Sequence, residues 1–375
     1  MKKNSFKKIS LIIASSLLLL SGCNSNESTS IINQTTSNIE VTNNDYLHFI
    51  GRASIEKNGD KDMLYFANSC SGFEFQINVT SSTYLKFSLY GKSTYEKQYA
   101  KVYVDNEELE ILEIQNGTKD YTLTNPVDVG EHEIKIIKLN EPNFSKMGLV
   151  KIYEGSFEFK QFTNSKTKKI EFYGDSISCG YGNKSTKLSG FSMEEEDGSL
   201  AYTELTTEEL NYENSVVSYS GIAMALSPFD SPYTMLDKYK TIDGDKEWNF
   251  DNYVPDIIVI NIGTNDNTKL RDYSGNAQID AINTFYDNLR TMSLDLHSKS
   301  PNAKFIFAYN MMVSISGGLV TCMESVCREL NEDDEIAYVL EFIPENKGAD
   351  GHPSIEGHKK SANALANFIR ENIGE

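Results

Sequence analysis

The chain has 375 residues, more than one hydrophobic core usually serves, so we expect two packed domains. Its 35 Lys and Arg residues stand against 54 Asp and Glu residues, which gives a formal net charge of −19. Such a charge repels polyanions, so nucleic acid is not an expected partner and neutral, uncharged ligands fit better.

The first residues have the pattern of an export signal. Four lysines precede an apolar stretch, residues 9–20, which is well short of the roughly 20 residues that a membrane-spanning helix needs. The stretch ends in Leu20-Ser21-Gly22-Cys23, which is similar to the bacterial lipoprotein box, whose cysteine is acylated. We therefore expect residues 1–23 to be a lipoprotein signal peptide and Cys23 to anchor an exported protein to the bacterial membrane. An ordinary cleaved signal with a chance cysteine is the alternative.

Residues 24–43 are rich in Ser, Asn and Thr and are predicted to be a flexible linker, because they offer too little apolar surface to fold. Residues 44–162 then alternate apolar and polar side chains in short runs separated by Gly, Asn and Asp. The expected strands cover residues 47–55, 63–67, 72–79, 84–90, 101–104, 110–114, 132–139 and 149–159. This spacing, with no convincing helix, predicts an antiparallel β-sandwich.

After a polar joint the pattern changes, and residues 168–375 alternate buried β runs with amphipathic helices. The expected strands cover residues 170–173, 215–219, 256–262, 304–309 and 336–342. The expected helices cover residues 202–210, 279–297, 319–330 and 355–372. This alternation predicts an α/β domain with a parallel sheet sandwiched by helices.

The cysteines beyond Cys23 give no sign of a metal centre. Cys70, Cys179, Cys322 and Cys327 form no Cys-x-x-Cys pair and no cluster with His at metal-ligand spacing. Buried free thiols are the expected state of all four. Neither a metal nor a cofactor is expected.

Polar groups follow four of the expected strands or loops of the second domain. Ligands of an open parallel sheet bind beyond the carboxyl ends of its strands, so these groups should meet at one edge. They are Gly174-Asp175-Ser176-Ile177, Ser220-Gly221, Gly263-Thr264-Asn265-Asp266 and Asp350-Gly351-His352-Pro353. A serine, a glycine, an asparagine and a histidine are therefore predicted to converge.

These four blocks, in this order, resemble those of the SGNH (GDSL-type) hydrolases. Within that superfamily the chain most resembles carbohydrate esterase family two, which includes acetyl xylan esterases, through four segments. They are GDSISCGYG at 174–182, EDGSLAY at 196–202, SYSG at 218–221 and WNF at 248–250. The resemblance implies a flavodoxin-like hydrolase domain preceded by a jelly-roll sandwich, and removal of acetyl groups from carbohydrate.

The residue types fit a serine esterase. A serine hydroxyl needs a base, and a neutral imidazole is suited to that at neutral pH, so Ser176 is the candidate nucleophile and His352 the candidate base. Attack on an ester creates an oxyanion, which needs donors aimed at it. The main-chain N–H groups of Ser176 and Gly221 and the side-chain amide of Asn265 are the candidates. Gly221 also lets the main chain approach closely.

What orients the imidazole is left open by the sequence. Many SGNH enzymes have an aspartate three residues before the histidine, where this chain has Ala349, while Asp350 lies two before. A Ser176-His352-Asp350 triad is favoured over a dyad that uses the main-chain oxygen of Asp350. His358, on the final helix, is the alternative base.

Three aromatic residues are candidates for substrate binding. Trp248, the only tryptophan, is expected either to stack on a sugar or to plug a hydrophobic gap. Tyr181 and Tyr202 are expected to line the same cleft. Asp175 is expected to form a turn, and Asp266 to support its neighbours.

The leading hypothesis is a surface-tethered esterase that removes O-acetyl groups from a plant polysaccharide or oligosaccharide through an acetyl-serine. One alternative is an SGNH lipase or thioesterase acting on longer acyl chains. Another is a carbohydrate-binding lipoprotein with an inert hydrolase domain. The α/β-hydrolase fold proper is disfavoured because the chain has no Gly-x-Ser-x-Gly elbow.

Overall fold

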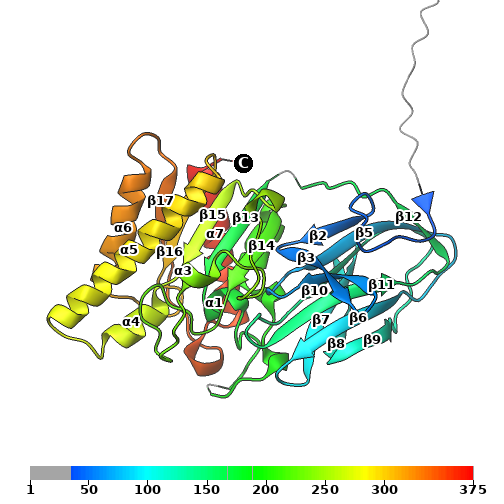
Figure 1. The fold of residues 1–375 in the computed structure, drawn as a ribbon, viewed down its shortest axis with the longest axis horizontal. Coiled ribbons are helices and arrows are strands. Elements are labelled where there is room, and N and C mark those ends of the chain that lie inside the picture. Colours follow the sequence, from blue (N-terminus) through cyan, green and yellow to red (C-terminus); the bar gives the residue numbers. More distant parts are fainter. Residues whose placement is uncertain (1–34, 167, 188, 375) are drawn as a thin grey trace, which may run out of the picture. The chain divides into compact units, whose positions relative to one another are not determined.

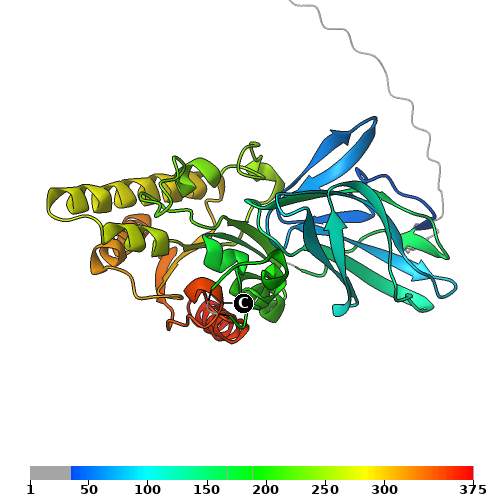
Figure 2. The same ribbon diagram turned by 90° about the horizontal axis from the view of Figure 1, so that it is seen from below.

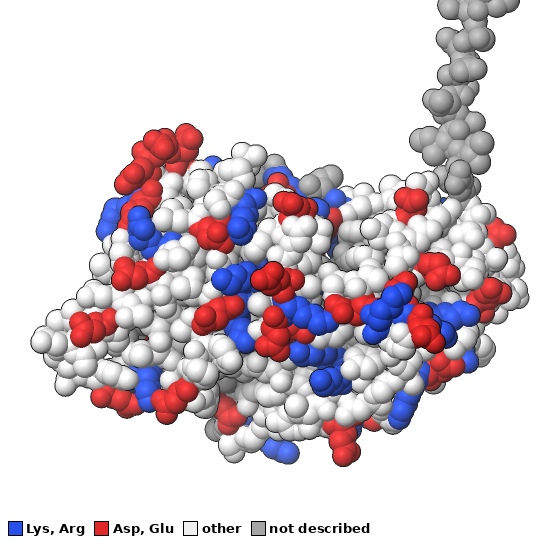
Figure 3. Space-filling model, viewed as in Figure 1, with Lys and Arg blue, Asp and Glu red and all other residues white. Residues whose placement is uncertain are grey.

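The structure is a computed structural model that describes residues 35–374 except 167 and 188. The predicted signal peptide with Cys23, and the first part of the predicted linker, lie outside the described residues. None of the described helices combines the length and the apolar character needed to span a bilayer. On the face shown in Figure 3, acidic and basic side chains are interspersed over the surface.

The N-terminal part of the described chain is a sandwich of two antiparallel sheets (Figures 1 and 2). One sheet has the order β1 (Thr35–Thr36), β12 (Phe157–Lys160), β5 (Gly72–Val79), β10 (Gly130–Lys138), β7 (Lys97–Val104) and β8 (Glu107–Gln115), with β2 (Leu47–Ile50) also paired to β5. The other has the order β3 (Ala53–Asn58), β4 (Lys61–Phe66), β11 (Ser145–Ile152), β6 (Lys86–Ser93) and β9 (Gly117–Thr122). Alternate side chains from both sheets meet in one core that includes Phe66, Phe73, Phe75 and Phe87.

Two of the predicted strands are each divided in the structure. The predicted strand 47–55 breaks at Gly51, whose φ of +68° turns the chain, so that β2 and β3 belong to different sheets. The predicted strand 149–159 is likewise divided between β11 and β12. The sequence pattern missed β9, because its side chains are mostly exposed and show no apolar alternation.

The predicted flexible linker extends too far toward the domain. Residues 35–36 form β1, which pairs with Phe159 and Lys160 of β12. Ile39 and Val41 are buried in the sandwich core. These two apolar side chains supply the surface that the rest of the polar segment lacks, so residues 35–43 pack against the sandwich.

The C-terminal part is a parallel sheet of five strands in the order 2-1-3-4-5, the flavodoxin-like arrangement. In spatial order these are β14 (Glu213–Ser218), β13 (Lys169–Gly174), β15 (Ile257–Asn261), β16 (Lys304–Tyr309) and β17 (Ala337–Glu341). The longer helices are α2 (Tyr202–Leu210), α5 (Asn276–Lys299), α6 (Gly317–Leu330) and α7 (Ile355–Asn372), and the short ones are α1 (Ser176–Cys179), α3 (Met235–Lys238) and α4 (Thr264–Leu270).

Helices cover both faces of this sheet (Figures 1 and 2). Successive residues of a strand point to opposite faces, so Ile258 and Ile260 of β15 pack in the core that α5 and α6 cover. Ile257 and Val259 pack in the other core, which α2 and α7 cover. Strands buried on both faces account for the continuous apolar runs of the sequence.

Arg52 of the sandwich inserts into the hydrolase domain from the turn between β2 and β3. Its side chain is fully buried, and its Nε donates to Oε1 of Glu171 at 2.9 Å. Its Nη1 donates to the carbonyls of Tyr239 at 2.5 Å and Thr241 at 2.8 Å, and its Nη2 to the Tyr173 hydroxyl at 2.8 Å. One buried cation therefore ties the sandwich to three segments of the hydrolase domain.

Arg52→Met should lower the free energy of unfolding by about 3–5 kcal/mol, because it leaves the Glu171 carboxylate buried without its cation. Chemical denaturation measures this change. Lys57→Met is the control, because the ion pair between Lys57 and Asp62 has side chains 68% and 41% exposed. It should change stability by less than about 1 kcal/mol. Equal effects of the two substitutions would show that Arg52 does not hold the domains together.

Candidate active site

Ser176 is the first residue of α1, directly after β13. The Asp175 side chain caps this turn by accepting from the Ile177 N–H at 3.0 Å, as a turn-forming aspartate should. Gly174 is required at the end of the strand, because a Cβ there would lie 2.1 Å from Oγ of Ser178. The tight turn aims the Ser176 hydroxyl out of the carboxyl edge of the sheet.

His352 lies between the 3₁₀ turn Ala349–Gly351 and α7, and its ring meets Ser176. The Nε2 atom is 2.7 Å from the Ser176 Oγ, and the Nδ1 atom is 2.9 Å from the Ala349 carbonyl oxygen. Because a carbonyl only accepts, Nδ1 carries the proton and the lone pair of Nε2 faces the serine hydroxyl. Burial lowers the pKa of His352 below its ordinary value, with the Ala349 bond opposing that change.

The predicted role of Asp350 in orienting the ring is corrected by this geometry. The ring bonds to the main-chain oxygen of Ala349, which is neither the Asp350 carboxylate nor the Asp350 carbonyl. Asp350 has a φ of +50°, in the left-handed region, and this turn directs its carboxylate elsewhere. The carboxylate instead accepts from the Tyr181 hydroxyl and the Gly190 N–H, each at 3.3 Å. The arrangement is a dyad with a main-chain acceptor.

Asp350→Asn should lower kcat by less than about tenfold, because the carboxylate does not bond to the imidazole. A true triad aspartate typically accounts for about 10⁴-fold. Steady-state hydrolysis of 4-nitrophenyl acetate measures the change, with wild type as reference. A loss of 10³-fold or more would restore the triad.

Gly221 and Asn265 stand on two other loops at the same edge of the sheet. Gly221 has a φ of +77° and follows β14, and among the described residues its N–H has no hydrogen-bond partner. The following main chain is held by Asp266, whose carboxylate accepts the N–H groups of residues 224–226 at 2.7 to 2.9 Å. The Asn265 side-chain amide donates to the Ile222 carbonyl at 2.8 Å, which fixes it beside this loop.

The four predicted groups surround one open cleft of about 670 Å³, which Ser176, Gly221, Asn265 and His352 all line. The sandwich contributes Asn143 and Phe144 to the same cleft. The remaining lining residues are Tyr181, Ser220, Pro228, Phe229, Thr264, Thr268, Met312 and Asp350. Both domains thus form the walls of the candidate site.

Of the three predicted substrate-binding aromatics, the structure places one in the cleft. The Tyr181 ring lies 4.5 Å from the His352 ring and stacks at 4.4 Å on Phe191. Tyr202 is wholly buried below the site, where its hydroxyl bonds to Oγ of Ser178 and the Asn261 amide. Trp248 is only 8% exposed. It packs in a separate hydrophobic cluster, with the Arg52 guanidinium 5.4 Å from its ring.

The prediction of a cleft role is therefore wrong for Tyr202 and Trp248. Tyr202 starts α2, whose apolar face packs against α7 and the sheet, so its ring fills the core. Trp248 follows the plug alternative. His358 is also wholly buried, and its Nδ1 accepts from the Tyr202 N–H at 3.1 Å. It has no access to the cleft and is not the base.

Sequence reasoning missed three cleft residues that no motif marks. Phe229 is 76% exposed and its ring covers Gly221, where a Cβ would lie 2.7 Å from it. Phe144 comes from the sandwich, and Met312 from the loop after β16. The loop that contains Phe229 has no regular period, and only the exposed apolar side chain itself was a signal.

Two family models match the chain. GDSL-like Lipase/Acylhydrolase matches residues 170–365, and Carbohydrate esterase 2 N-terminal matches residues 49–170. The chain belongs to the GDSL-like lipase/acylhydrolase family. The resemblance to SGNH hydrolases with a family-two sandwich is thereby confirmed, and with it the two-domain fold class.

The curated relatives are similar in both domains. Cellulase/esterase CelE of Acetivibrio thermocellus is 28% identical over 285 residues, which cover 72% of this chain. The matched region spans about a third of that relative, 34% of its length. An acetylxylan esterase / glucomannan deacetylase of Cellvibrio japonicus is 23% identical over 343 residues, covering 88% of this chain and 91% of the relative.

Solved structures share the fold. A family two carbohydrate esterase from Clostridium thermocellum, in complex with cellohexaose, superposes with a TM-score of 0.77 at 23% identity, covering 88% of this chain and 99% of that one. The acetyl xylan esterase Est2A from Butyrivibrio proteoclasticus gives a TM-score of 0.78 at 19% identity, covering 91% and 99%. These matches extend over the sandwich and the hydrolase domain together.

Proposed function

We propose that this protein is a serine esterase that removes O-acetyl groups from a neutral polysaccharide or oligosaccharide, such as acetylated xylan or glucomannan. The observation that carries the proposal is the 2.7 Å bond between the Ser176 hydroxyl and the His352 imidazole at an open cleft. The names of the curated relatives, an esterase and acetylxylan esterases, point to the same reaction.

The proposed reaction has two halves. Nε2 of His352 takes the Ser176 proton as the hydroxyl oxygen attacks the acetyl carbonyl, and the N–H groups of Ser176 and Gly221 and the Asn265 amide bind the oxyanion. The carbon–oxygen bond to the sugar then breaks, and the imidazolium returns the proton to the sugar hydroxyl. Water, deprotonated by His352, attacks the acetyl-Ser176 ester and releases acetate, which restores the enzyme.

The character of the cleft supports a neutral sugar as substrate. Among the described residues that line it, Asp350 alone carries a carboxylate, and none is Lys or Arg. Tyr181 and Phe229 offer partly exposed ring faces, while Asn143 and Ser220 offer hydrogen bonds to hydroxyl groups. Rings with a few polar groups suit sugars, whose surfaces are part apolar and part hydroxyl.

A cell-surface location would suit this substrate. We propose that the chain is exported and that Cys23 is acylated, on the evidence of the lipoprotein box. A polymer too large to enter a cell is then met outside it, with the enzyme held at the membrane.

Acetate release from acetylated xylan, acetylated glucomannan and 4-nitrophenyl acetate tests the proposed activity. Wild type should release acetate, and Ser176→Ala should lower kcat by about 10⁴-fold or more, because the covalent route is removed. Comparison of 4-nitrophenyl acetate with the decanoate separates a deacetylase from a lipase. Binding of xylan with an ester hydrolysis that Ser176→Ala leaves unchanged would favour an inert, sugar-binding protein.

The pH dependence should report His352. The base works in its neutral form, which dominates above its pKa, and burial lowers that pKa below its ordinary value. We therefore expect kcat/KM for 4-nitrophenyl acetate to hold at neutral pH and to fall on acidification, with its midpoint below about 6.5. A midpoint clearly above this value would contradict a buried, neutral His352 as the base.

A further inference from the structure

A loop of the sandwich reaches into the hydrolase domain beside the candidate active site. It joins β10 to β11, and its Glu141 is wholly buried although it belongs to a loop. The neighbouring Asn143 and Phe144 line the cleft. A buried carboxylate is costly unless it is hydrogen-bonded, so its partners show what it holds.

The Glu141 carboxylate holds Ser220, the residue before Gly221. One oxygen accepts the Ser220 N–H at 2.7 Å, and the other accepts the Ser220 hydroxyl. Asn143 of the same loop donates to the Ser220 carbonyl at 3.1 Å. The sandwich thus bonds every polar group of Ser220, and Gly221, whose N–H is a candidate oxyanion donor, comes next in the chain.

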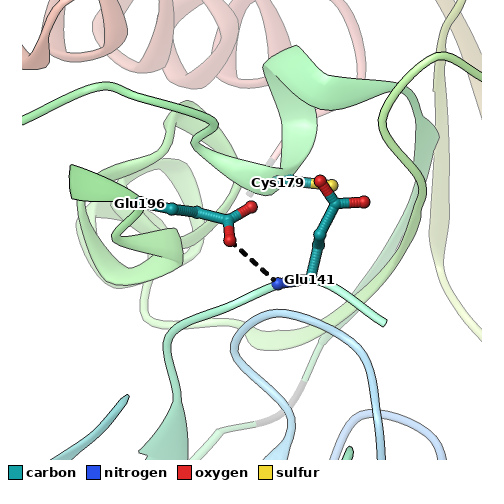
Figure 4. Close-up of side chains that lie close together, drawn as sticks. All are labelled: Glu141, Cys179 and Glu196. Atoms are coloured by element: carbon teal, nitrogen blue, oxygen red, sulfur yellow. Dashed lines mark hydrogen bonds between the residues drawn. The ribbon is translucent and has the colours of Figure 1, made fainter. Parts of the chain in front are cut away.

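Glu141 also lies beside the helix that contains the candidate nucleophile. Figure 4 shows its carboxylate next to Cys179, the last residue of α1, with Glu196 on the other side. The Cys179 thiol in turn donates to Oγ of Ser218, on the strand that leads to Ser220. One carboxylate of the sandwich therefore stands between α1 and the Gly221 loop.

A metal ion is the competing interpretation of this cluster. Ligand atoms of Glu141, Cys179 and Glu196 lie within 4.8 Å of one another. However, both oxygens of Glu141 already accept bonds from Ser220. The buried Lys138 lies close enough for its charge to favour the Glu141 carboxylate, and it would repel a cation. Burial and the Glu141 charge raise the pKa of Glu196, which favours its neutral form. Hydrogen bonds and Lys138 account for the Glu141 carboxylate without a metal.

We propose that Glu141 is a positioning residue, through which the sandwich fixes the Gly221 N–H for oxyanion binding. The inference rests on the proposed esterase function. It makes the β-sandwich part of the catalytic apparatus, because the hydrolase domain has no group of its own on Ser220. Oxyanion stabilisation depends on donors held in place before the reaction, and loss of one such donor costs about 10²–10³ in kcat.

Three variants of the full chain test the role, with kcat and KM for 4-nitrophenyl acetate as readout. Glu141→Ala frees the Ser220 loop without removing the Gly221 N–H, so kcat should fall roughly 10–100-fold while KM stays within about twofold. Glu141→Gln keeps one accepting oxygen and should recover most of that loss. Tyr65→Phe, the matched control, removes a buried hydrogen bond between the domains, from Tyr65 to Asp243 at 2.6 Å, and should leave kcat unchanged.

Several results would overturn the inference. They are a wild-type kcat in Glu141→Ala, a change confined to KM, or an equal loss in Tyr65→Phe, which would make the effect one of domain packing. Stoichiometric metal in the purified protein that Cys179→Ala removes would establish the competing site. If Glu141→Ala does not fold, Ser220→Ala replaces it and should lower kcat severalfold through loss of the hydroxyl bond; an unchanged kcat would then count against the role.

The failure of the proposed function would look different. In that case the wild type would neither hydrolyse the ester nor react at Ser176 with a phosphonate probe that modifies activated serines. An active, phosphonate-sensitive wild type whose Glu141→Ala variant is equally active would overturn only the role of Glu141.

Discussion

The hydrogen bond between the Ser176 hydroxyl and the His352 imidazole, 2.7 Å long, sets the demands on the rest of the site. The two residues lie 176 positions apart, so only the parallel sheet brings them together. Ser176 is held by the turn that Asp175 caps, and His352 by the carbonyl of Ala349. Each end of the bond is thus fixed by a local turn at one edge of the sheet.

A neutral acceptor behind the imidazole has a consequence for the base. A carbonyl fixes the Nδ1 tautomer as well as a carboxylate does, but it offers no full negative charge to stabilise the imidazolium. Burial lowers the pKa of His352 further. The ring is therefore neutral at physiological pH, and the Asp350 carboxylate, turned toward Tyr181, acts on it only through space.

The two domains are joined by buried charge at separate places. Arg52 enters the hydrolase domain between Glu171 and the carbonyls of Tyr239 and Thr241, while Glu141 enters beside Ser220. Each charge is costly to bury, and each is compensated only when the partner domain stands in one orientation. Such contacts specify geometry more than they add stability. This would explain why the family relatives match over both domains together.

The sequence by itself determined the two-domain class, much of the secondary structure and the chemical groups of the site. The strand Gly72–Val79 and the helices Tyr202–Leu210 and Ile355–Asn372 agree with prediction in full, because their apolar period is strong. The serine and the histidine were identifiable because each lies in a short motif at the end of a strand or before a helix. These are local signals, and local sequence encodes them.

Only the tertiary structure decided which groups touch. The φ of +50° at Asp350 turned its carboxylate away and left the Ala349 oxygen to orient the imidazole. Tyr202 and Trp248 are in the right motifs but on buried faces, and no period within a short segment tells a cleft from a core. Glu141 lies in the other domain, outside every motif. Contacts between distant segments depend on how whole elements pack, and packing is a property of the assembled fold.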